Sequence, residues 1–513
     1  MCFVGNSSDS AGSNSVPSVT QSEIRFLPMP TAPALHLAAI DLGATSGRVI
    51  LGTWKNSRLT LREVHRFPNA FQSLGNHDYW NIAGLWSEIL TGLRAAVAAL
   101  PKGAKLASVG VDTWGVDYAL VNDTGRLVYP VHAYRDDRTQ PGLKRLAHTR
   151  AALERIYAAT GIPNVFYNSS LQLEETVATH PAITDLATRC LLLPDYFNFL
   201  LSGKMANELT IASTTQLLDV HSTDWSRAAL DHFRIPSHWL SKPVLAGTKL
   251  GKVRALPELP ALASAQVIAV PGHDTACAYD AMPASPDGTD LFLSSGTWSL
   301  VGFESDTPVL GADALAARIS NERIGDGRYR PLTNIIGLWL LEGIMKDFAS
   351  RPTNDAAWAK LITAAENLRG SELARDLLDI TDPALTNPKS MKAAIDAQLK
   401  KRRIPAPKTL AGYTRLICDS LGRGHADAKT SFERMSGRTF KRILMVGGGS
   451  KNRLLCQATA NAAGIPVVSF ALEGTAVGNL ANQLVALRAV KNIAAFRALF
   501  APTLKQTIYT PRD

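Results

Sequence analysis

Apolar and polar positions near the start of the chain follow a pattern that predicts three antiparallel strands. A short apolar run at residues 35–40 ends in Asp41, and a second run at residues 49–54 follows a turn of glycine and hydroxyl residues. Residues 55–57 are typical of a hairpin turn, and residues 59–67 then alternate apolar and polar side chains. We therefore expect a strand–turn–strand unit followed by a third strand.

A predicted helix follows the three strands, and a further apolar strand comes after it. Residues 82–100 carry apolar side chains at helical spacing, and Pro101 stands just beyond them. Residues 106–111 form an apolar run that ends at Asp112. Because strands and helices alternate in this way, the sequence predicts an α/β fold.

The order of a strand followed by a turn of glycine and hydroxyl residues recurs later in the chain. It is found at residues 267–275, 290–303 and 442–452. Such widely separated repeats indicate two related halves that face one another. Prolines and a glycine cluster between residues 282 and 288, which predicts a boundary there. The expected domains are residues 35–284 and 285–500, with a C-terminal tail at 501–513.

The first 34 residues differ from the rest and are expected to form a disordered tail. Residues 1–21 are rich in Ser, Asn, Gly and Val and carry almost no charge. They contain neither a basic start followed by an apolar block nor the arginines of a transit peptide, so no secretory or organellar signal is predicted. Met29 is an alternative start of the protein.

Composition supports a folded chain and leaves a surplus of positive charge to explain. Of 513 residues, 46% are hydrophobic and 19% charged, which excludes wholesale disorder. No apolar run reaches the roughly 20 residues of a membrane span, and the five cysteines are scattered without C-x-x-C spacing. A soluble protein of the reducing cytoplasm is expected.

The net charge of +10 does not by itself define a partner. An anionic small substrate, a nucleic acid or a membrane surface would each suit a basic protein. The dense basic run at residues 400–403 ends a predicted helix, where cations are favourable, and no nucleic-acid-binding motif accompanies it. We therefore expect neither a nucleic acid nor a membrane as partner.

Several common catalytic motifs are absent from the sequence. It has no G-x-x-x-x-G-K-[ST] loop, no G-x-S-x-G elbow, no protein-kinase H-R-D, and no G-x-G-x-x-G after a strand. No cluster of His, Cys and carboxylates has zinc spacing. These absences disfavour a standard nucleotide loop, a serine hydrolase and a Rossmann dehydrogenase.

The turn after Asp41 has the chemistry of a phosphate site. The backbone amides and hydroxyls of Ala44, Thr45 and Ser46 can donate hydrogen bonds to phosphate oxygens, and Asp41 can hold Mg²⁺ directly or through water. An ordinary hairpin whose Asp satisfies its own turn explains the same residues. The turn at residues 294–299 offers the same donors without a carboxylate, so only the first turn would hold the metal.

Two further segments are candidates for chemistry. In the first, Asp274 either caps the helix that follows or acts as the general base for a hydroxyl attacking a phosphoryl group, with His273 and Thr275 orienting substrate hydroxyls. In the second, the triple glycine at residues 447–449 either lets an adenine and its ribose lie against backbone or forms a flexible connection. Residues 473–479 begin an apolar helix. This segment can equally be a packing segment, in which Gly478 lets two helices approach closely.

Together these segments resemble the FGGY sugar kinases, which share the fold of actin, hexokinase and the heat-shock ATPases. The resemblance implies two RNase-H-like α/β domains with a cleft between them, and ATP-dependent phosphorylation of L-rhamnulose at its 1-hydroxyl. L-fuculose, L-ribulose and xylulose are alternative acceptors. The matching segments run in family order: IDLGATSGR at 40–48, VGVDTWGVDYAL at 109–120, AYRDDRT at 133–139, residues 193–220, GHDT at 272–275, LSSGTWSL at 293–300 and VGGGSKN at 446–452.

The resemblance also implies roles for individual residues, with ATP and Mg²⁺ as cofactors and a monomer or small homo-oligomer as the assembly. Asp274 matches the catalytic base. Sugar-contacting positions are matched by Gly115, His273, Asp274, Thr275 and Asn334, and nucleotide-contacting positions by Ala44, Thr45, Ser46, Gly47, Arg48, Thr297, Glu342 and Gly448. A non-catalytic ATP-binding regulator with the actin-like fold is the alternative from another class, and the presence of Asp274 argues against it.

Overall fold

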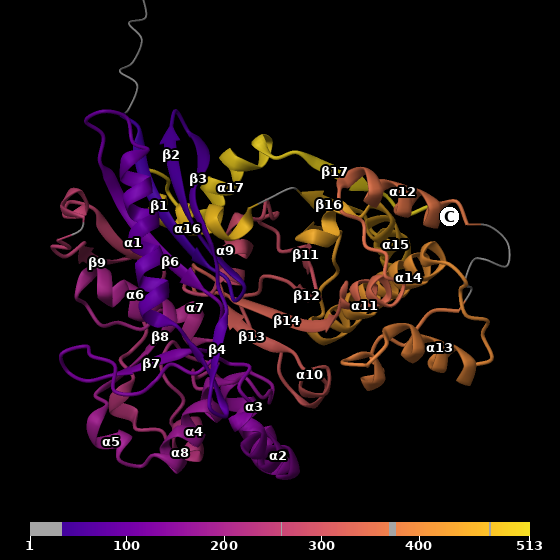
Figure 1. The fold of residues 1–513 in the computed structure, drawn as a ribbon, viewed down its shortest axis with the longest axis horizontal. Helices are drawn as coiled ribbons and strands as arrows, with labels where there is room; N and C mark the ends of the chain where they lie inside the picture. The colour runs from indigo at the N-terminus through magenta and orange to yellow at the C-terminus, as the bar shows by residue number, and fades with distance from the viewer. Residues whose placement is uncertain (1–32, 258, 369–375, 471–472, 513) are drawn as a thin grey trace, which may run out of the picture.

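A computed structural model describes residues 33–257, 259–368, 376–470 and 473–512, and it contains two large sheets flanked by helices (Figure 1). The predicted disordered tail falls, apart from its last two residues, outside the described residues. None of the described helices is long and apolar enough to cross a membrane.

The first sheet confirms the three antiparallel strands predicted at the start of the chain. β1 pairs antiparallel with β2, and β2 with β3, while β6 and β10 run parallel to β1. The strands lie in the order β3 (Arg58–Pro68), β2 (Ser46–Lys55), β1 (Leu35–Leu42), β6 (Leu106–Thr113), β10 (Gln266–Ala269) and β9 (Thr248–Lys252).

The second sheet repeats this topology, which confirms the expected relation between the two halves. β14, β12 and β11 form an antiparallel meander, and β15 and β16 follow parallel to β11. The order is β13 (Ser320–Arg323), β14 (Tyr329–Ile336), β12 (Trp298–Gly302), β11 (Asp290–Ser295), β15 (Arg442–Val446), β16 (Val467–Phe470) and β17 (Gln506–Tyr509). β17 lies within the predicted C-terminal tail, so the sheet extends beyond residue 500 and that tail is not separate from the domain.

Apolar helix faces cover both faces of each sheet. α1 and α6 pack on one face of the first sheet, and α16 and α17 pack on the other (Figure 1). α11, α13, α14 and α15 cover the second sheet, and Tyr279 of α9 and Met282 just beyond that helix pack on its opposite face. These helices are α1 (Ile82–Ala98), α6 (Leu193–Ser202), α9 (Asp274–Ala281), α11 (Trp339–Asp347), α13 (Met391–Lys401), α14 (Leu410–Ser436), α15 (Arg453–Ala463), α16 (Gly474–Ala486) and α17 (Ile493–Phe500).

The remaining elements belong to a lobe beside the first sheet or to the surface of the second. A separate apolar core joins the β7–β8 pair to surrounding helices. These elements are β4 (Phe71–Leu74), β5 (His77–Trp80), β7 (Tyr118–Val121), β8 (Arg189–Leu192), α2 (Gln140–His148), α3 (Arg150–Thr160), α4 (Ser169–Thr179), α5 (Ile183–Leu186), α7 (Leu209–Ala212), α8 (Arg227–Phe233), α10 (Ala312–Ala316) and α12 (Asp355–Glu366).

α9 and α16 pack tightly against each other between the two sheets. A Cβ added to Gly478 would lie 1.8 Å from the carbonyl oxygen of Cys277, so only glycine permits this approach. Gln483 of α16 donates to Ala38 O at 2.9 Å and accepts from Ser108 Oγ at 2.6 Å. α16 follows β16 of the second sheet in sequence, yet it is bonded to the first sheet and ties the two together.

Asp280 in this helix pair makes the stability depend on pH. Burial raises the pKa of Asp280 to about 7, although Arg497 and a 2.8 Å hydrogen bond from Asn482 oppose the rise. The folded protein therefore keeps a proton that the unfolded chain releases, and the free energy of unfolding falls as pH rises from about 4 to about 7. Asp280→Asn lacks this contribution. The difference in unfolding free energy between wild type and variant, measured with urea, should change by up to about 4 kcal/mol across that window. If the unfolding free energies of wild type and Asp280→Asn changed with pH in the same way, the raised pKa of Asp280 would be contradicted.

Candidate active site

Three aspartates meet at the carboxyl ends of neighbouring parallel strands. Asp41 on β1 lies directly opposite Asp112 on β6 in the strand register. Asp274 begins α9, just after β10, and the preceding residue His273 forms a bridge with Thr113 at the end of β6. In open α/β sheets ligands bind at this edge.

Asp41 is nearly buried and is paired with Arg48. Arg48 Nε donates to Asp41 Oδ2 at 2.8 Å, and Arg48 Nη1 donates to Glu473 Oε2 at 2.5 Å. Burial raises the pKa of Asp41, while Arg48 partly opposes this effect. Arg48, which was predicted to contact ATP, therefore connects the first phosphate turn to the start of α16.

Asp112 was not singled out from the sequence, yet it is the most confined carboxylate of the three. It is fully buried, and Asn479 Nδ2 of α16 donates to its Oδ2 at 2.6 Å. Its Oδ1 has no hydrogen-bond partner within the described residues. Burial raises the pKa of Asp112 well above its usual value, and the nearby charges of Asp41 and Asp274 raise it further. A cation would relieve this concentration of negative charge.

The carboxylates fit a Mg²⁺ ion that arrives with a phosphate ligand. Across the described ranges, no three His, Cys, Asp or Glu side chains converge into a complete metal cage. Mg²⁺ usually keeps several waters and binds through one or two carboxylates together with substrate phosphates. The unpartnered oxygen of Asp112 and the neighbouring Asp41 supply the hard oxygen donors that such an ion requires.

Each of the two predicted phosphate turns is closed by a backbone hydrogen bond, which spans four residues in the first turn and three in the second. Gly43 N donates to Ser46 O in the β1–β2 turn, and Gly296 N donates to Trp298 O in the β11–β12 turn, both at 2.9 Å. Thr45 and Thr297, near the tips of the two turns, are exposed. Each turn thus exposes one threonine hydroxyl that could donate to a phosphate oxygen.

The triple glycine packs beside the second turn. A Cβ on Gly447 would lie 2.5 Å from Ser295 O, and one on Gly449 would lie 2.1 Å from Ser295 Oγ. A Cβ on Gly448 would meet no atom within 4 Å. The outer glycines are therefore required for packing, and Gly448 borders open space against which a flat ligand can lie.

Thr297 contacts the start of α11, which carries Glu342. Trp339 N donates to Thr297 O at 3.2 Å. Glu342 forms a 3.1 Å ion pair with Arg351 at the surface. None of the hydrogen bonds or ion pairs of the described residues joins Glu342 to Gly448, so its nucleotide role stays a prediction.

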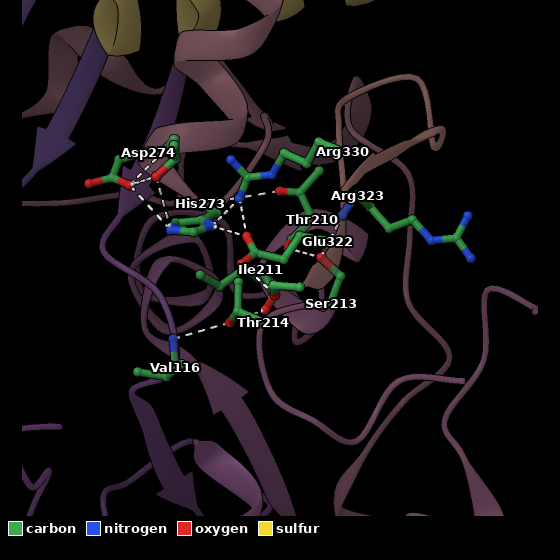
Figure 2. A network of polar contacts seen from close by, with 12 residues as sticks. Val116, Thr210, Ile211, Ser213, Thr214, His273, Asp274, Glu322, Arg323 and Arg330 are labelled. Carbon is green, nitrogen blue, oxygen red and sulfur yellow. Dashed lines mark hydrogen bonds and ion pairs between the residues drawn. The ribbon is translucent and has the colours of Figure 1, made fainter. Parts of the chain in front are cut away.

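Three of the predicted sugar residues, Gly115, Asp274 and Thr275, lie close to His273, and Figure 2 shows Asp274 beside its ring. A Cβ on Gly115 would lie 3.4 Å from His273 Nε2 and 3.4 Å from Thr214. Thr275 Oγ1 is 3.3 Å from the same nitrogen. Asn334 is exposed on β14, and its hydrogen bond with Tyr167 partly opposes the raised pKa that burial gives this tyrosine.

Asp274 takes the first position of α9, and His273, at the N-cap position, makes no side-chain cap hydrogen bond. Asp274 Oδ1 accepts from Thr275 N at 2.5 Å and from Thr275 Oγ1 at 3.0 Å. Its Oδ2 accepts no hydrogen bond from the part of the chain that the structure describes. One oxygen thus fixes the carboxylate while the other is available to a substrate hydroxyl.

Comparison with known proteins places this arrangement in a family. The N-terminal domain of the FGGY family of carbohydrate kinases matches residues 36–279, and its C-terminal domain matches residues 291–487. Rhamnulokinase of Klebsiella pneumoniae subsp. pneumoniae is 38% identical over 478 residues, covering 93% of this chain and 94% of the relative. Rhamnulokinase of Bacteroides thetaiotaomicron is 36% identical over 476 residues, covering 93% and 96%.

Solved structures share the fold at low sequence identity. Gluconate kinase from Lactobacillus acidophilus superposes with a TM-score of 0.76 at 14% identity, over 94% of both chains. Plasmodium falciparum glycerol kinase with ADP gives 0.77 at 12% identity, over 93% of this chain and 94% of the other. This chain belongs to the FGGY family of carbohydrate kinases, which use ATP as a substrate.

Proposed function

We propose that the chain transfers the γ-phosphoryl group of ATP to the 1-hydroxyl of L-rhamnulose, giving L-rhamnulose 1-phosphate and ADP. The curated relatives named rhamnulokinase, at 36–38% identity over about 93% of the chain, support this acceptor. The observation that carries the chemistry is Asp274, with one oxygen fixed by Thr275 and the other unpartnered, beside His273 and Gly115.

In the proposed reaction, Asp274 Oδ2 accepts the proton of the sugar hydroxyl as its oxygen attacks the γ-phosphorus. The bond between the γ-phosphorus and the bridging oxygen breaks, and ADP leaves with that oxygen. The transition state is loose, so positioning and charge neutralisation contribute most of the rate. Asp41 and Asp112 would hold Mg²⁺, which neutralises phosphate charge when bound.

We further propose that the two turns grip phosphates and that Gly448 borders the adenosine. Gly448→Ala should raise the KM for ATP about 10-fold, since its methyl group enters the space that the nucleotide would use. The KM for the sugar serves as the internal control and should stay within about twofold. Steady-state kinetics with each substrate varied in turn give both values. An unchanged KM for ATP would contradict this placement.

The boundary between the two domains, at residues 284 and 285, belongs to this proposal, and the second domain extends past residue 500 to include β17. A monomer or small homo-oligomer that binds no nucleic acid and no membrane belongs to the proposal as well. The extents of the two family matches support the boundary. A reducing compartment such as the cytoplasm suits the chain, because Cys190, Cys277, Cys418 and Cys456 are free and buried.

ADP release with a panel of sugars tests the proposed substrate. L-rhamnulose should stimulate release most strongly, compared with L-fuculose, L-ribulose, D-xylulose and glycerol. Preference for another ketose would contradict L-rhamnulose as the substrate but would still support sugar kinase activity. ATP binding without sugar-stimulated ADP release would favour a non-catalytic regulator instead.

A further inference from the structure

A buried ion pair from the second sheet reaches His273 in the sugar site. Glu322 on β13 and Arg330 on β14 face each other in the strand register. Arg330 is fully buried, Glu322 is 9% exposed, and the two side chains form an ion pair. Figure 2 shows the imidazole of His273 between this pair on one side and Asp274 on the other.

The β13–β14 hairpin that carries the pair is anchored to the first half of the chain. Asn321 N donates to Gly161 O at 3.0 Å, and Tyr329 OH donates to Val220 O at 2.5 Å. Arg323 N donates to Ser213 Oγ at 2.9 Å. These bonds hold the β13–β14 hairpin of the second half in place next to His273.

Hydrogen-bond chemistry decides which nitrogen of His273 carries the proton. Arg330 Nη2 lies 2.5 Å from His273 Nδ1, and a guanidinium has donors but no acceptor. Nδ1 must therefore accept, which leaves the proton of the neutral ring on Nε2. Glu322 Oε2, 3.1 Å from Nδ1, would favour the opposite tautomer if Arg330 were absent.

Glu322 remains a carboxylate that balances the charge of Arg330. Burial acts to raise the pKa of Glu322, but the charge of Arg330 opposes this effect, and the pKa of that carboxyl lies below its usual value. Arg330 also lies over the ring of Tyr279, with its guanidinium carbon 5.4 Å from the ring centroid. Since its charge is compensated within the fold, its donor stays directed at the imidazole.

The opposite nitrogen faces the predicted sugar residues. His273 Nε2 lies 3.3 Å from Thr275 Oγ1 and 3.4 Å from Asp274 Oδ1. Gly115, which has no side chain, leaves space beside it. A proton on Nε2 can therefore be donated to a sugar oxygen next to the proposed base.

We propose that Arg330 and Glu322 are positioning residues that hold His273 in the Nε2–H form as a hydrogen-bond donor to the sugar. This inference rests on the proposed function, because it assumes that the ligand beside His273 is a sugar. It makes sugar recognition depend on a strand pair of the second sheet, while the predicted nucleotide contacts do not depend on that pair.

Long-range ¹H–¹⁵N correlation spectra of the intact protein, labelled with ¹⁵N-histidine, test the inference. Loss of signals in His273→Asn assigns the residue. Wild-type His273 should show the Nε2–H pattern, and Arg330→Met should switch it to Nδ1–H, because Glu322 then becomes the partner of Nδ1. Arg323→Met removes another buried arginine of the same hairpin and should leave the Nε2–H pattern in place. An Nδ1–H pattern in wild type, or an unchanged pattern in Arg330→Met, would overturn the inference.

Kinetics and a titration of the wild type complete the test. Arg330→Met should raise the KM for the sugar about 10- to 100-fold with the KM for ATP nearly unchanged, and Arg330→Lys should restore part of the loss. If Arg330→Met does not fold, L-rhamnulose added to wild type must still shift the Nε2 signal without changing the tautomer. An active kinase whose Nε2 signal ignores the sugar contradicts this inference alone, whereas absent sugar-stimulated ADP release contradicts the proposed function.

Discussion

Asp274→Asn is expected to lower sugar-dependent turnover by about 10²- to 10⁴-fold. The amide keeps the size of the side chain and an oxygen that can accept from Thr275, but it cannot take a proton from the sugar hydroxyl. A base acts in the chemical step, so ATP should bind with nearly wild-type affinity. Single-turnover kinetics measure the first effect, and calorimetric titration with ATP measures the second.

The matched control is Asp313→Asn, which removes a carboxylate paired with Arg434 at the exposed surface. Its turnover should equal that of wild type, because surface ion pairs contribute little and none of the hydrogen bonds or ion pairs of the described residues joins this pair to the three aspartates. Near-normal turnover of Asp274→Asn, with the same behaviour in the control, would refute Asp274 as the general base.

Gly478→Ala should cause the largest loss of stability among conservative substitutions in α16, about 3 kcal/mol. Alanine normally favours a helix over glycine by up to about 1 kcal/mol, so the clash must exceed that gain. The obstructing atoms are backbone atoms of Cys277, 1.8 to 2.9 Å from the added Cβ. They move only if α9 moves, and α9 carries Asp274, so turnover should fall as well.

Urea unfolding measures the stability change, and Gly448→Ala is the matched control, since its added methyl group meets nothing within 4 Å. The control should unfold at nearly the wild-type urea concentration. Equal midpoints for the two variants would mean that α9 and α16 are not as closely packed as their geometry requires.

The sequence predicted the parts of the site that depend on local signals. Strand–turn–strand patterns predicted both glycine-hydroxyl turns, and the strand before Pro271 located His273 and Asp274 at the start of a helix. Glycine is informative because it is required where backbones approach closely, as Gly447 and Gly478 do. Such features depend on neighbours within a few residues, or on a backbone requirement that only one residue type meets.

The parts that were missed depend on contacts between distant strands and helices. Asp112 follows an apolar run as Asp41 does, but only the parallel pairing of β1 with β6 brings the two together. Glu322 and Arg330 need the register of a hairpin and its contact with the first half of the chain. Arg48 was expected to contact the phosphates of ATP, and in the structure it is paired with Asp41 and Glu473. The pairing with Glu473 could not be predicted because this residue lies 425 positions further along the chain.

The positive charge of the chain does not account for the site. The proposed phosphate grip relies on backbone amides, hydroxyls and Mg²⁺, and the arginine nearest to it, Arg48, is paired with two carboxylates. The net charge of +10 can raise the local concentration of an anion such as ATP. The function follows from the three strand ends and the residues around His273.

Product analysis shows whether the protein phosphorylates the 1-hydroxyl of L-rhamnulose. The enzyme is incubated with ATP, Mg²⁺ and L-rhamnulose, and ADP and sugar phosphate are quantified together by mass spectrometry, with the phosphorylated carbon identified by NMR. We expect one sugar phosphate per ADP, with the phosphate on the 1-hydroxyl. ADP formed without sugar phosphate, or no ADP with any sugar of the panel, would contradict this expectation.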